Sequence, residues 1–390
     1  MAGAARLEAF RAQIAPIAAI TLFGLSISLS QPLFGLLLER MGASGTAIGF
    51  NHAATAISTV VFAPVMPAIL ARLGLARLMV WSTLLMAATL LAAGLWHDFW
   101  FWMAMRVAFG FAGTVLFFGS EYWIVAAAPD AARGRVVAIY SISVSGAFLA
   151  GPLVLAAVGI DGIAPFAVAA ALTLLGLPPI LWGRASAPDP GDAAPASPAA
   201  AVGFFRSDPS IVWGVALFGM IEFGVLGLVP VWAVRSGLSE GQAVVLLALF
   251  AFGGMVLQWP IGWAADRLNR RVLMIAGGGA CLAMPLTMIA AAPALPWLWV
   301  AMFVWGGLSV ALYTVALTEV GARYRGVRLS EANAAIILAY GIGALAAPVA
   351  LGLAMDAVPP DGLLWLSAAV AGAYALLLVL RWGRRPADSA

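Results

Sequence analysis

Long apolar runs, each interrupted by charged residues, Pro or clustered Gly, follow one another along almost the whole chain. A helix that crosses a membrane needs about 20 predominantly apolar residues, and the runs are close to that length. The pattern predicts spanning helices at 14–38, 48–70, 78–95, 100–125, 136–159, 163–182, 210–234, 243–265, 272–291, 297–320, 331–354 and 363–381. We therefore expect an all-α integral membrane protein with twelve transmembrane helices.

The composition supports this interpretation and excludes several other classes. Of 390 residues, 64% are hydrophobic and 9% are charged, whereas a soluble domain has about 45–50% apolar and about 25% charged residues. The single Cys, Cys281, excludes an intramolecular disulfide, and two His residues without a Cys cluster give no sign of a zinc site. The net charge of +3 is too small to suggest a nucleic-acid partner. No cofactor is expected.

The Arg residues indicate how the helices are oriented. All 20 basic residues are Arg, and if the N-terminus lies inside, the outside loops carry only Arg40 and Arg235 while the inside loops carry seventeen. Loops on the cytoplasmic side of a membrane are enriched in basic residues. We therefore expect both termini in the cytoplasm. The first run, 14–38, lacks a small-residue cleavage site and is expected to be a retained helix.

A shift of about 195 residues places features of the first half on equivalent positions of the second. Residues 40–44 fall on residues 235–239, and Pro152 falls within one residue of Pro348. Six helices return the chain to the same side, so the repeats are parallel, an arrangement that suits alternating access. The alternative is a repeat that is kept for packing alone, as in a membrane scaffold.

Between the repeats, the chain is rich in Ala, Pro and Asp and cannot bury a core. This predicts two pseudo-symmetric six-helix bundles, at 1–182 and 210–390, which are joined by a flexible cytoplasmic linker at 183–209.

Residues 262–271 read Gly-Trp-Ala-Ala-Asp-Arg-Leu-Asn-Arg-Arg. This stretch resembles the Gly-x-x-x-Asp-Arg-x-x-Arg-Arg loop of the major facilitator superfamily. In the family this loop braces a gate in the outward-open state, so the resemblance implies gating roles for Gly262, Asp266 and Arg267. Gly262 is expected to allow close helix packing, and Asp266 to accept hydrogen bonds from helix N-termini or Arg residues. The first-half copy has Ala71 in place of the acid. The alternative is that the Arg residues only fix the topology.

Arg106 and Gly110 resemble an Arg-x-x-x-Gly pattern that the family associates with proton-coupled antiport. An Arg inside a span costs about 2.5–3.5 kcal/mol, so it normally faces a cavity or a partner. The alternative is that the Arg106 side chain extends to the outer interface.

Gly146, Gly151 and Pro152 are similar to a Gly-Pro motif of the family's antiporters, although the spacing differs. Small residues let helices approach and Pro removes a backbone hydrogen bond, so the motif implies a bendable seam, with Pro348 at the equivalent place. The resemblance covers the whole chain and points to a poorly characterised bacterial branch similar to drug-efflux proteins. It implies location in the bacterial inner membrane.

Glu222 lies in the middle of the run 210–234. An ionised carboxylate near the bilayer midplane is unfavourable, so Glu222 is expected to change its protonation as its exposure alternates and to carry the coupled proton. In the resembling fold the runs that hold Arg106 and Glu222 line the cavity, so the two are expected to form a pair that substrate releases. The alternative is a protonated Glu222 that serves only in packing.

Two further acids, Glu121 and Glu319, lie far along their spans. For both, a gate contact with Arg135 or Arg328 is expected in preference to proton transfer. Other side chains are expected in the cavity because their helices line it in the resembling fold, namely Gln31, Phe109, Phe117, Phe223, Trp305 and Tyr313. Aromatic surfaces suit amphipathic solutes better than sugars, although aromatic residues that face lipid look the same in the sequence.

The leading hypothesis is a monomeric, proton-coupled antiporter that exports an amphipathic small molecule across a lipid bilayer. The alternatives are a proton symporter or facilitator for uptake of an organic solute and, outside transport, a membrane scaffold or receptor-like protein. An enzyme is not expected, because no nucleophile, metal or acid–base cluster gathers at one face. ATP-driven transport is not expected either, because the phosphate-binding Gly-x-x-x-x-Gly-Lys loop is missing.

Overall fold

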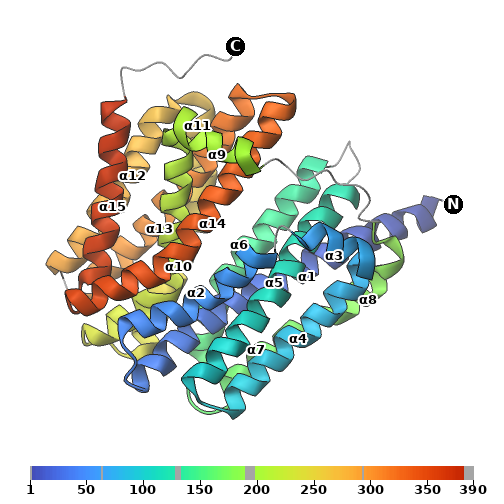
Figure 1. Cartoon of the computed structure of the whole chain (residues 1–390), viewed down its shortest axis with the longest axis horizontal. Coiled ribbons are helices and arrows are strands. Elements are labelled where there is room, and N and C mark those ends of the chain that lie inside the picture. Colours follow the sequence, from blue (N-terminus) through green and yellow to red (C-terminus); the bar gives the residue numbers. More distant parts are fainter. Residues whose placement is uncertain (1, 63–64, 128–132, 189–197, 292–293, 382–390) are drawn as a thin grey trace. The chain divides into compact units, whose positions relative to one another are not determined.

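The computed structural model describes residues 2–62, 65–127, 133–188, 198–291 and 294–381, and in these ranges it is helical throughout, without strands (Figure 1). The helices of the first half are α1 (Ala2–Arg40), α2 (Gly45–Phe62), α3 (Met66–Leu73), α4 (Leu75–Leu95), α5 (Phe99–Ala127), α6 (Arg133–Val158), α7 (Ala164–Leu174) and α8 (Leu177–Gly183). Those of the second half are α9 (Pro198–Ser207), α10 (Pro209–Arg235), α11 (Glu240–Arg267), α12 (Arg270–Ala291), α13 (Leu295–Arg323), α14 (Gly326–Ala357) and α15 (Gly362–Leu380).

Eleven helical stretches in the described part of the chain are long and apolar enough to cross a membrane. The second predicted span, 48–70, is not among them; its described residues belong to α2 and α3, and residues 63–64 lie outside the described part of the chain. Pro67 lies in the first turn of α3, a position where the missing N–H of Pro removes no helical hydrogen bond. The predicted total of twelve therefore stays a prediction.

Two other expectations need changes of detail. The sixth predicted span, 163–182, is interrupted where α7 ends and α8 begins, and there the Gly176 N–H donates to the Thr173 carbonyl at 3.1 Å. The predicted linker, 183–209, contains the helix α9. Its residues 189–197 lie outside the described part of the chain.

The chain divides into two compact units. The first comprises Met1–Leu38 and Ala54–Ala193, and the second comprises Glu39–Ala53 and Ala194–Ala390. The short stretch Glu39–Ala53 thus belongs by sequence to the first half but packs in the second unit. The two bundles at 1–182 and 210–390 stay a prediction.

In the second unit, α10 and α14 lie against each other at very short distance. A Cβ atom on Gly219 of α10 would lie 2.5 Å from the Tyr340 carbonyl oxygen, and one on Gly343 of α14 would overlap the Ala216 carbonyl oxygen. Only glycine allows two helix backbones to approach so closely. These glycines therefore set the position of α14 residues relative to α10.

The sequence repeat at 40–44 and 235–239 extends to backbone conformation. Gly42 and Gly237 both have positive φ, of 77° and 90°, which glycine adopts without strain. The Ser44 hydroxyl accepts from the Ala47 N–H at 3.1 Å, and the Ser239 hydroxyl accepts from the Gln242 N–H at 3.3 Å. Each turn thus ends one helix with Gly and begins the next with a Ser cap.

Candidate functional site

The central feature of the second unit is a carboxylate on α10. The Tyr340 hydroxyl of α14 donates to Glu222 Oε2 at 2.6 Å. The glycine contacts between α10 and α14 hold these two residues opposite each other, and both side chains are partly exposed. The sequence does not indicate Tyr340 as a site residue, because it is one polar side chain in an apolar run and its partner is 118 residues away.

Aromatic rings surround this pair. The Phe218 ring lies 5.5 Å from Tyr313 and 5.9 Å from Tyr340, and the Phe223 ring lies 6.1 Å from Tyr340. We call Phe218, Glu222, Phe223, Tyr313 and Tyr340 the Glu222 cluster. Three helices, α10, α13 and α14, contribute to it. The cluster therefore combines one acid with aromatic rings, of which Phe218 is buried while Phe223, Tyr313 and Tyr340 are partly exposed.

Arg106 of α5 forms a separate site in the first unit. Its side chain is 1% exposed, its guanidinium donates to Gln31 Oε1, and its Cζ lies 4.9 Å from the centre of the Phe34 ring. An extension of Arg106 to the outer interface does not agree with this burial. Because Glu222 belongs to the other unit, the pairing of Arg106 with Glu222 stays a prediction.

The remaining cavity candidates divide into core and surface residues. Phe109 and Trp305 are 3% and 0% exposed, and Trp305 packs edge-on against Phe250 at 6.0 Å. Both side chains are thus buried in this structure, and their place in a substrate cavity stays a prediction. Phe117 is 39% exposed and contacts the Phe23 ring at 6.4 Å.

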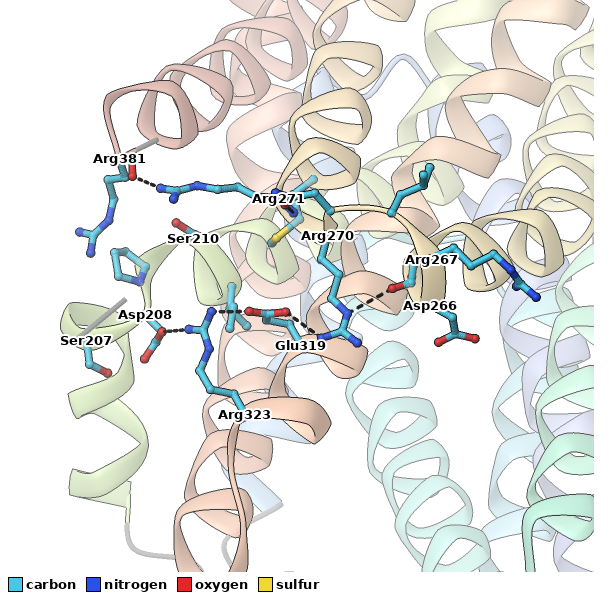
Figure 2. Close-up of a pocket in the computed structure, with 16 residues that line it drawn as sticks. Ser207, Asp208, Ser210, Asp266, Arg267, Arg270, Arg271, Glu319, Arg323 and Arg381 are labelled. Atoms are coloured by element: carbon cyan, nitrogen blue, oxygen red, sulfur yellow. Dashed lines mark hydrogen bonds and ion pairs between the residues drawn. The ribbon is translucent and has the colours of Figure 1, made fainter. Parts of the chain in front are cut away.

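A second group of charges lines a cavity of about 440 Å³ at the ends of α10 to α13 in the second unit, which we call the Arg-rich end. Figure 2 shows Glu319 between two Arg side chains. Glu319 Oε2 lies 3.2 Å from Arg270, Glu319 Oε1 accepts from Arg323, and Arg323 lies 2.7 Å from Asp208. The Tyr324 hydroxyl donates to Asp208 at 2.6 Å, and burial together with this bond raises the pKa of Tyr324.

Arg270 of the stretch 262–271 takes part in this chain of ion pairs, whereas Asp266 and Arg267 line the same cavity to one side of it (Figure 2). Arg267 stacks on the Trp263 ring at 4.5 Å and is exposed. Asp266 makes no hydrogen bond within the described residues, so the expected bonds to helix N-termini or Arg are not formed in this structure. The close helix packing that was expected at Gly262 is not present in this structure, because a Cβ there would have no atom within 4 Å.

The expected partners of the other acids differ as well. Arg328, one of the two Arg residues expected to contact Glu121 or Glu319, lies 3.6 Å from Glu331 on its own helix. The side chain of Arg135 lies outside the described residues, so the pairing of Glu121 with it stays a prediction.

The Gly-Pro stretch of α6 shows one close approach and one open position. A Cβ on Gly151 would overlap Ser28 of α1, as expected for a seam between helices, whereas Gly146 has open space around it. Pro152 and Pro348 both lie inside continuous helices. The hinge role of these residues stays a prediction.

A third group of charges connects the repeated turns, and we call it the Arg235 end. Arg235 binds both oxygens of Glu39, at 2.9 and 2.7 Å, and Arg40 binds Glu240 at 2.6 Å. Asp356 of α14 lies 3.6 Å from Arg235. The signal in the sequence was the pair Arg40 and Arg235, since these are the basic residues of the predicted outside loops and are related by the repeat.

Asp356 also holds the beginning of α2. Its carboxylate accepts from the Gly45 N–H at 2.7 Å, from the Thr46 N–H at 2.8 Å and from the Thr46 hydroxyl at 2.6 Å. One turn later, a Cβ on Gly49 would overlap the Pro348 carbonyl oxygen of α14. Residues 39–53 are therefore attached to the second unit by charge at one end and by close backbone packing along α2.

Comparisons with known proteins agree with a transporter fold. The family model described as Major Facilitator Superfamily matches residues 17–327. An uncharacterised MFS-type transporter of Yersinia enterocolitica, YE1530, is 26% identical over 92% of this chain and 93% of its own length. A Bacillus subtilis protein described in the same way, YfkF, is 24% identical over 66% of each chain.

Solved structures give the same result at the level of fold. The nucleoside transporter NupG has a TM-score of 0.76 at 13% identity and covers 97% of this chain and 100% of its own. A D-xylose-proton symporter has a TM-score of 0.73 at 15% identity, over 95% of this chain and 97% of its own.

Proposed function

This chain belongs to the Major Facilitator Superfamily, and we propose that it is a secondary transporter that exports an amphipathic small molecule in exchange for protons. Membership makes it a multi-pass membrane transport protein rather than an enzyme. In the proposal it acts as a monomer in a bacterial inner membrane, with both termini and the Arg-rich end in the cytoplasm and the Arg235 end outside. The observation that carries the proposal is Glu222, a partly exposed carboxylate in the middle of a spanning helix.

Glu222 supports proton coupling because its charge has to be compensated within the membrane. An ionised carboxylate away from water needs hydrogen bonds or a cation, and Tyr340 supplies a single hydrogen bond. A proton that enters from outside neutralises the carboxylate, and water that enters from the cytoplasm accepts the proton again. In the proposal Arg106 pairs with Glu222 during part of the cycle and is released when substrate binds.

Two networks of ion pairs support alternating access, because each suits a gate on one side. The Arg235 end holds residues 39–53 on the second unit and serves as the outer gate. The Arg-rich end, with Glu319 between Arg270 and Arg323, serves as part of the inner gate. In the proposal the loop with Gly262, Asp266 and Arg267 braces the outward-open state. Further gate contacts come from Glu121, Arg135 and Arg328. The helices bend at Gly146, Gly151, Pro152 and Pro348.

The test is proton movement in liposomes that contain the purified protein and an internal pH indicator. A panel of amphipathic compounds is added, and a transported compound should move protons in the opposite direction across the bilayer. Glu222→Gln should abolish this proton movement without changing the folded yield or the insertion into liposomes. Glu331→Gln, which removes an acid from the beginning of α14 beside Arg328, is the matched control and should leave the movement unchanged.

Each outcome has a defined meaning. Proton movement at the wild-type rate in the Glu222→Gln variant would reject Glu222 as the proton carrier. Movement of protons in the same direction as the compound would replace export by antiport with uptake by symport.

A further inference from the structure

An apolar groove lies between three helices of the second unit. It is lined by α10, α14 and α15 and has a volume of about 420 Å³. Apart from Trp213 and Tyr374, every lining residue is Ala, Gly, Leu, Ile, Val or Met. Trp213 is 46% exposed, and Ala346 and Ala373 on the other two helices are exposed as well. The groove is therefore open at the surface of a unit that spans the membrane, where hydrocarbon surrounds the protein in place of water.

One end of the groove adjoins the Arg-rich end. The Tyr374 hydroxyl in the groove donates to the carbonyl of Ser210, which lines the charged cavity, at 2.9 Å. On α15, the Arg381 N–H donates to the carbonyl of the groove residue Leu377 at 3.1 Å, so Arg381 continues the last helical turn beyond Leu377. Residues four apart lie on the same face of a helix. An Arg therefore lies at the end of the apolar groove.

The charge at this end is positive. Five Arg and three acidic residues line the cavity, and two of the acids, Asp208 and Glu319, are engaged by Arg323. The Arg381 carbonyl accepts from Arg271, whereas the Arg381 side chain points away from Arg271 (Figure 2). Within the described residues, the Arg381 guanidinium makes no ion pair or hydrogen bond. Its charge is therefore available to an anionic ligand.

Aromatic residues indicate that the same end lies at a membrane surface. The Phe205 ring of α9 packs edge-on against the Trp213 ring at 5.6 Å. Trp is enriched where the hydrocarbon of a bilayer meets the headgroups. Arg206, which follows Phe205, is exposed and has no ion pair or hydrogen bond in the part of the chain that the structure describes. The packing of α9 thus places a second cationic residue beside a wall of the groove.

We propose that the second unit binds an anionic phospholipid, with an acyl chain in the groove and the phosphate at Arg381 and Arg206. A lipid fits better than a soluble phosphate compound, because only an acyl chain covers the apolar lining. An anionic headgroup fits better than a zwitterionic one, because the latter would bring an ammonium group among Arg side chains. In the proposed orientation the site lies in the cytoplasmic leaflet. The inference depends neither on the substrate nor on proton coupling.

The experiment measures lipid affinity by native mass spectrometry of the purified, delipidated full chain in detergent. The probes are dioleoylphosphatidylglycerol, dioleoylphosphatidylcholine with the same acyl chains, and glycerol 3-phosphate without acyl chains. The wild type should hold one phosphatidylglycerol at least about tenfold more tightly than phosphatidylcholine, since each Arg near a headgroup increases the affinity about fivefold. Glycerol 3-phosphate should not displace the lipid.

Charge variants test the headgroup site. Arg381→Gln should weaken binding of phosphatidylglycerol about fivefold and leave that of phosphatidylcholine nearly unchanged. Adding Arg206→Gln should remove the remaining preference, so that the double variant binds the two lipids alike. Arg184→Gln is the matched control, because Arg184 is an exposed Arg that follows α8 in the first unit. It should leave both affinities unchanged.

Two variants of α15 test the groove separately from the charge. Ala373→Trp fills the groove and should weaken binding of both lipids about fivefold or more, because the acyl chain loses apolar contact. Leu376→Trp lies on the same helix at a position that is 57% exposed and does not line the groove, so it should leave both affinities unchanged. Because both positions are exposed, both variants should keep the wild-type folded yield.

Several results would overturn the proposal. Equal affinity of the wild type for the two lipids would show that the headgroup is not recognised. Displacement of the lipid by glycerol 3-phosphate would assign the Arg residues to a soluble anion. An equal loss in Arg184→Gln would attribute the preference to net charge alone. A lipid-free dimer that Ala373→Trp dissociates would show that a second copy of the chain covers the groove.

Discussion

The attachment of α2 to the second unit can be tested at one side chain, Asp356. Replacement by Asn removes the negative charge and one of two acceptor oxygens, while the size of the side chain is kept. The wild-type carboxylate accepts three hydrogen bonds from Gly45 and Thr46, at 2.6 to 2.8 Å, and lies 3.6 Å from Arg235. We expect Asp356→Asn to loosen residues 39–53 and to increase the fraction of molecules in which the outer gate is open.

The magnitude follows from the bonds that are lost. A hydrogen bond to a charged group contributes about 1.5–3 kcal/mol, whereas the ion pair with Arg235 contributes little because the Asp356 side chain is 31% exposed. Asn can still accept one bond from the beginning of α2. A net loss of about 2 kcal/mol corresponds to an increase of about thirtyfold in the open fraction.

The assay measures labelling of a single reporter Cys on α2. Ile48 is fully buried, and the native Cys281 is also fully buried, so both should react slowly in the closed state. In an Ile48→Cys background, a membrane-impermeant maleimide added from outside should label the Asp356→Asn variant at least about tenfold faster than its parent. Glu331→Gln in the same background is the control and should label at the parental rate. A parental rate in the Asp356→Asn variant would show that the three hydrogen bonds do not hold the gate.

Other consequences of the structure are open to simple measurements. Asp266→Asn should slow labelling of the same Ile48→Cys reporter, because it weakens the proposed brace of the outward-open state. This change in labelling rate is opposite to the one expected for Asp356→Asn. An unchanged rate would count against the brace. Gly343→Ala should lower the thermal unfolding temperature, because its Cβ overlaps a carbonyl oxygen of α10 and overpacking costs about 1–3 kcal/mol. Gly341→Ala on the same helix has open space and should not, so equal midpoints for the two variants would refute the packing argument. Glu319→Gln should lower the midpoint by the equivalent of about 1 kcal/mol, since two Arg side chains lose a shared carboxylate, and a midpoint at or above the wild-type value would contradict this.

The apolar runs predicted the spanning helices well because lipid selects a long stretch of apolar residues and a helix satisfies the backbone within it. Positions 48–70 were harder, because hydropathy does not show where Pro residues allow one helix to end and another to begin, and Pro67 lies in the first turn of α3. Glu222 was predicted as a candidate from the sequence since a lone acid at mid-span is costly. Its partner Tyr340 was not, because contacts between helices depend on rotation about the helix axis, which composition does not encode.

The charged residues at the helix ends also have partners that the sequence does not predict. Arg40 and Arg235 were recognised as related by the repeat, but their partners Glu39 and Glu240 depend on how the turns fold back. Phe109 and Trp305, which were expected in a cavity, are buried in this structure. Their cavity position stays a prediction, since a large aromatic side chain suits both a core and a cavity. Gly262 illustrates the reverse case, in which a motif residue is present and the close packing is missing.

The close packing of α10 on α14 has a consequence for the energy source of transport. Gly219 and Gly343 lock the two helices together, so Tyr340 stays on Oε2 of Glu222 while the unit moves. In the proposed cycle the coupled proton then binds and leaves at Oε1, because Tyr340 holds Oε2. One proton that enters for each neutral molecule exported would carry one positive charge inward. Proton-driven export of a neutral compound should therefore depend on the membrane voltage as well as on the pH difference.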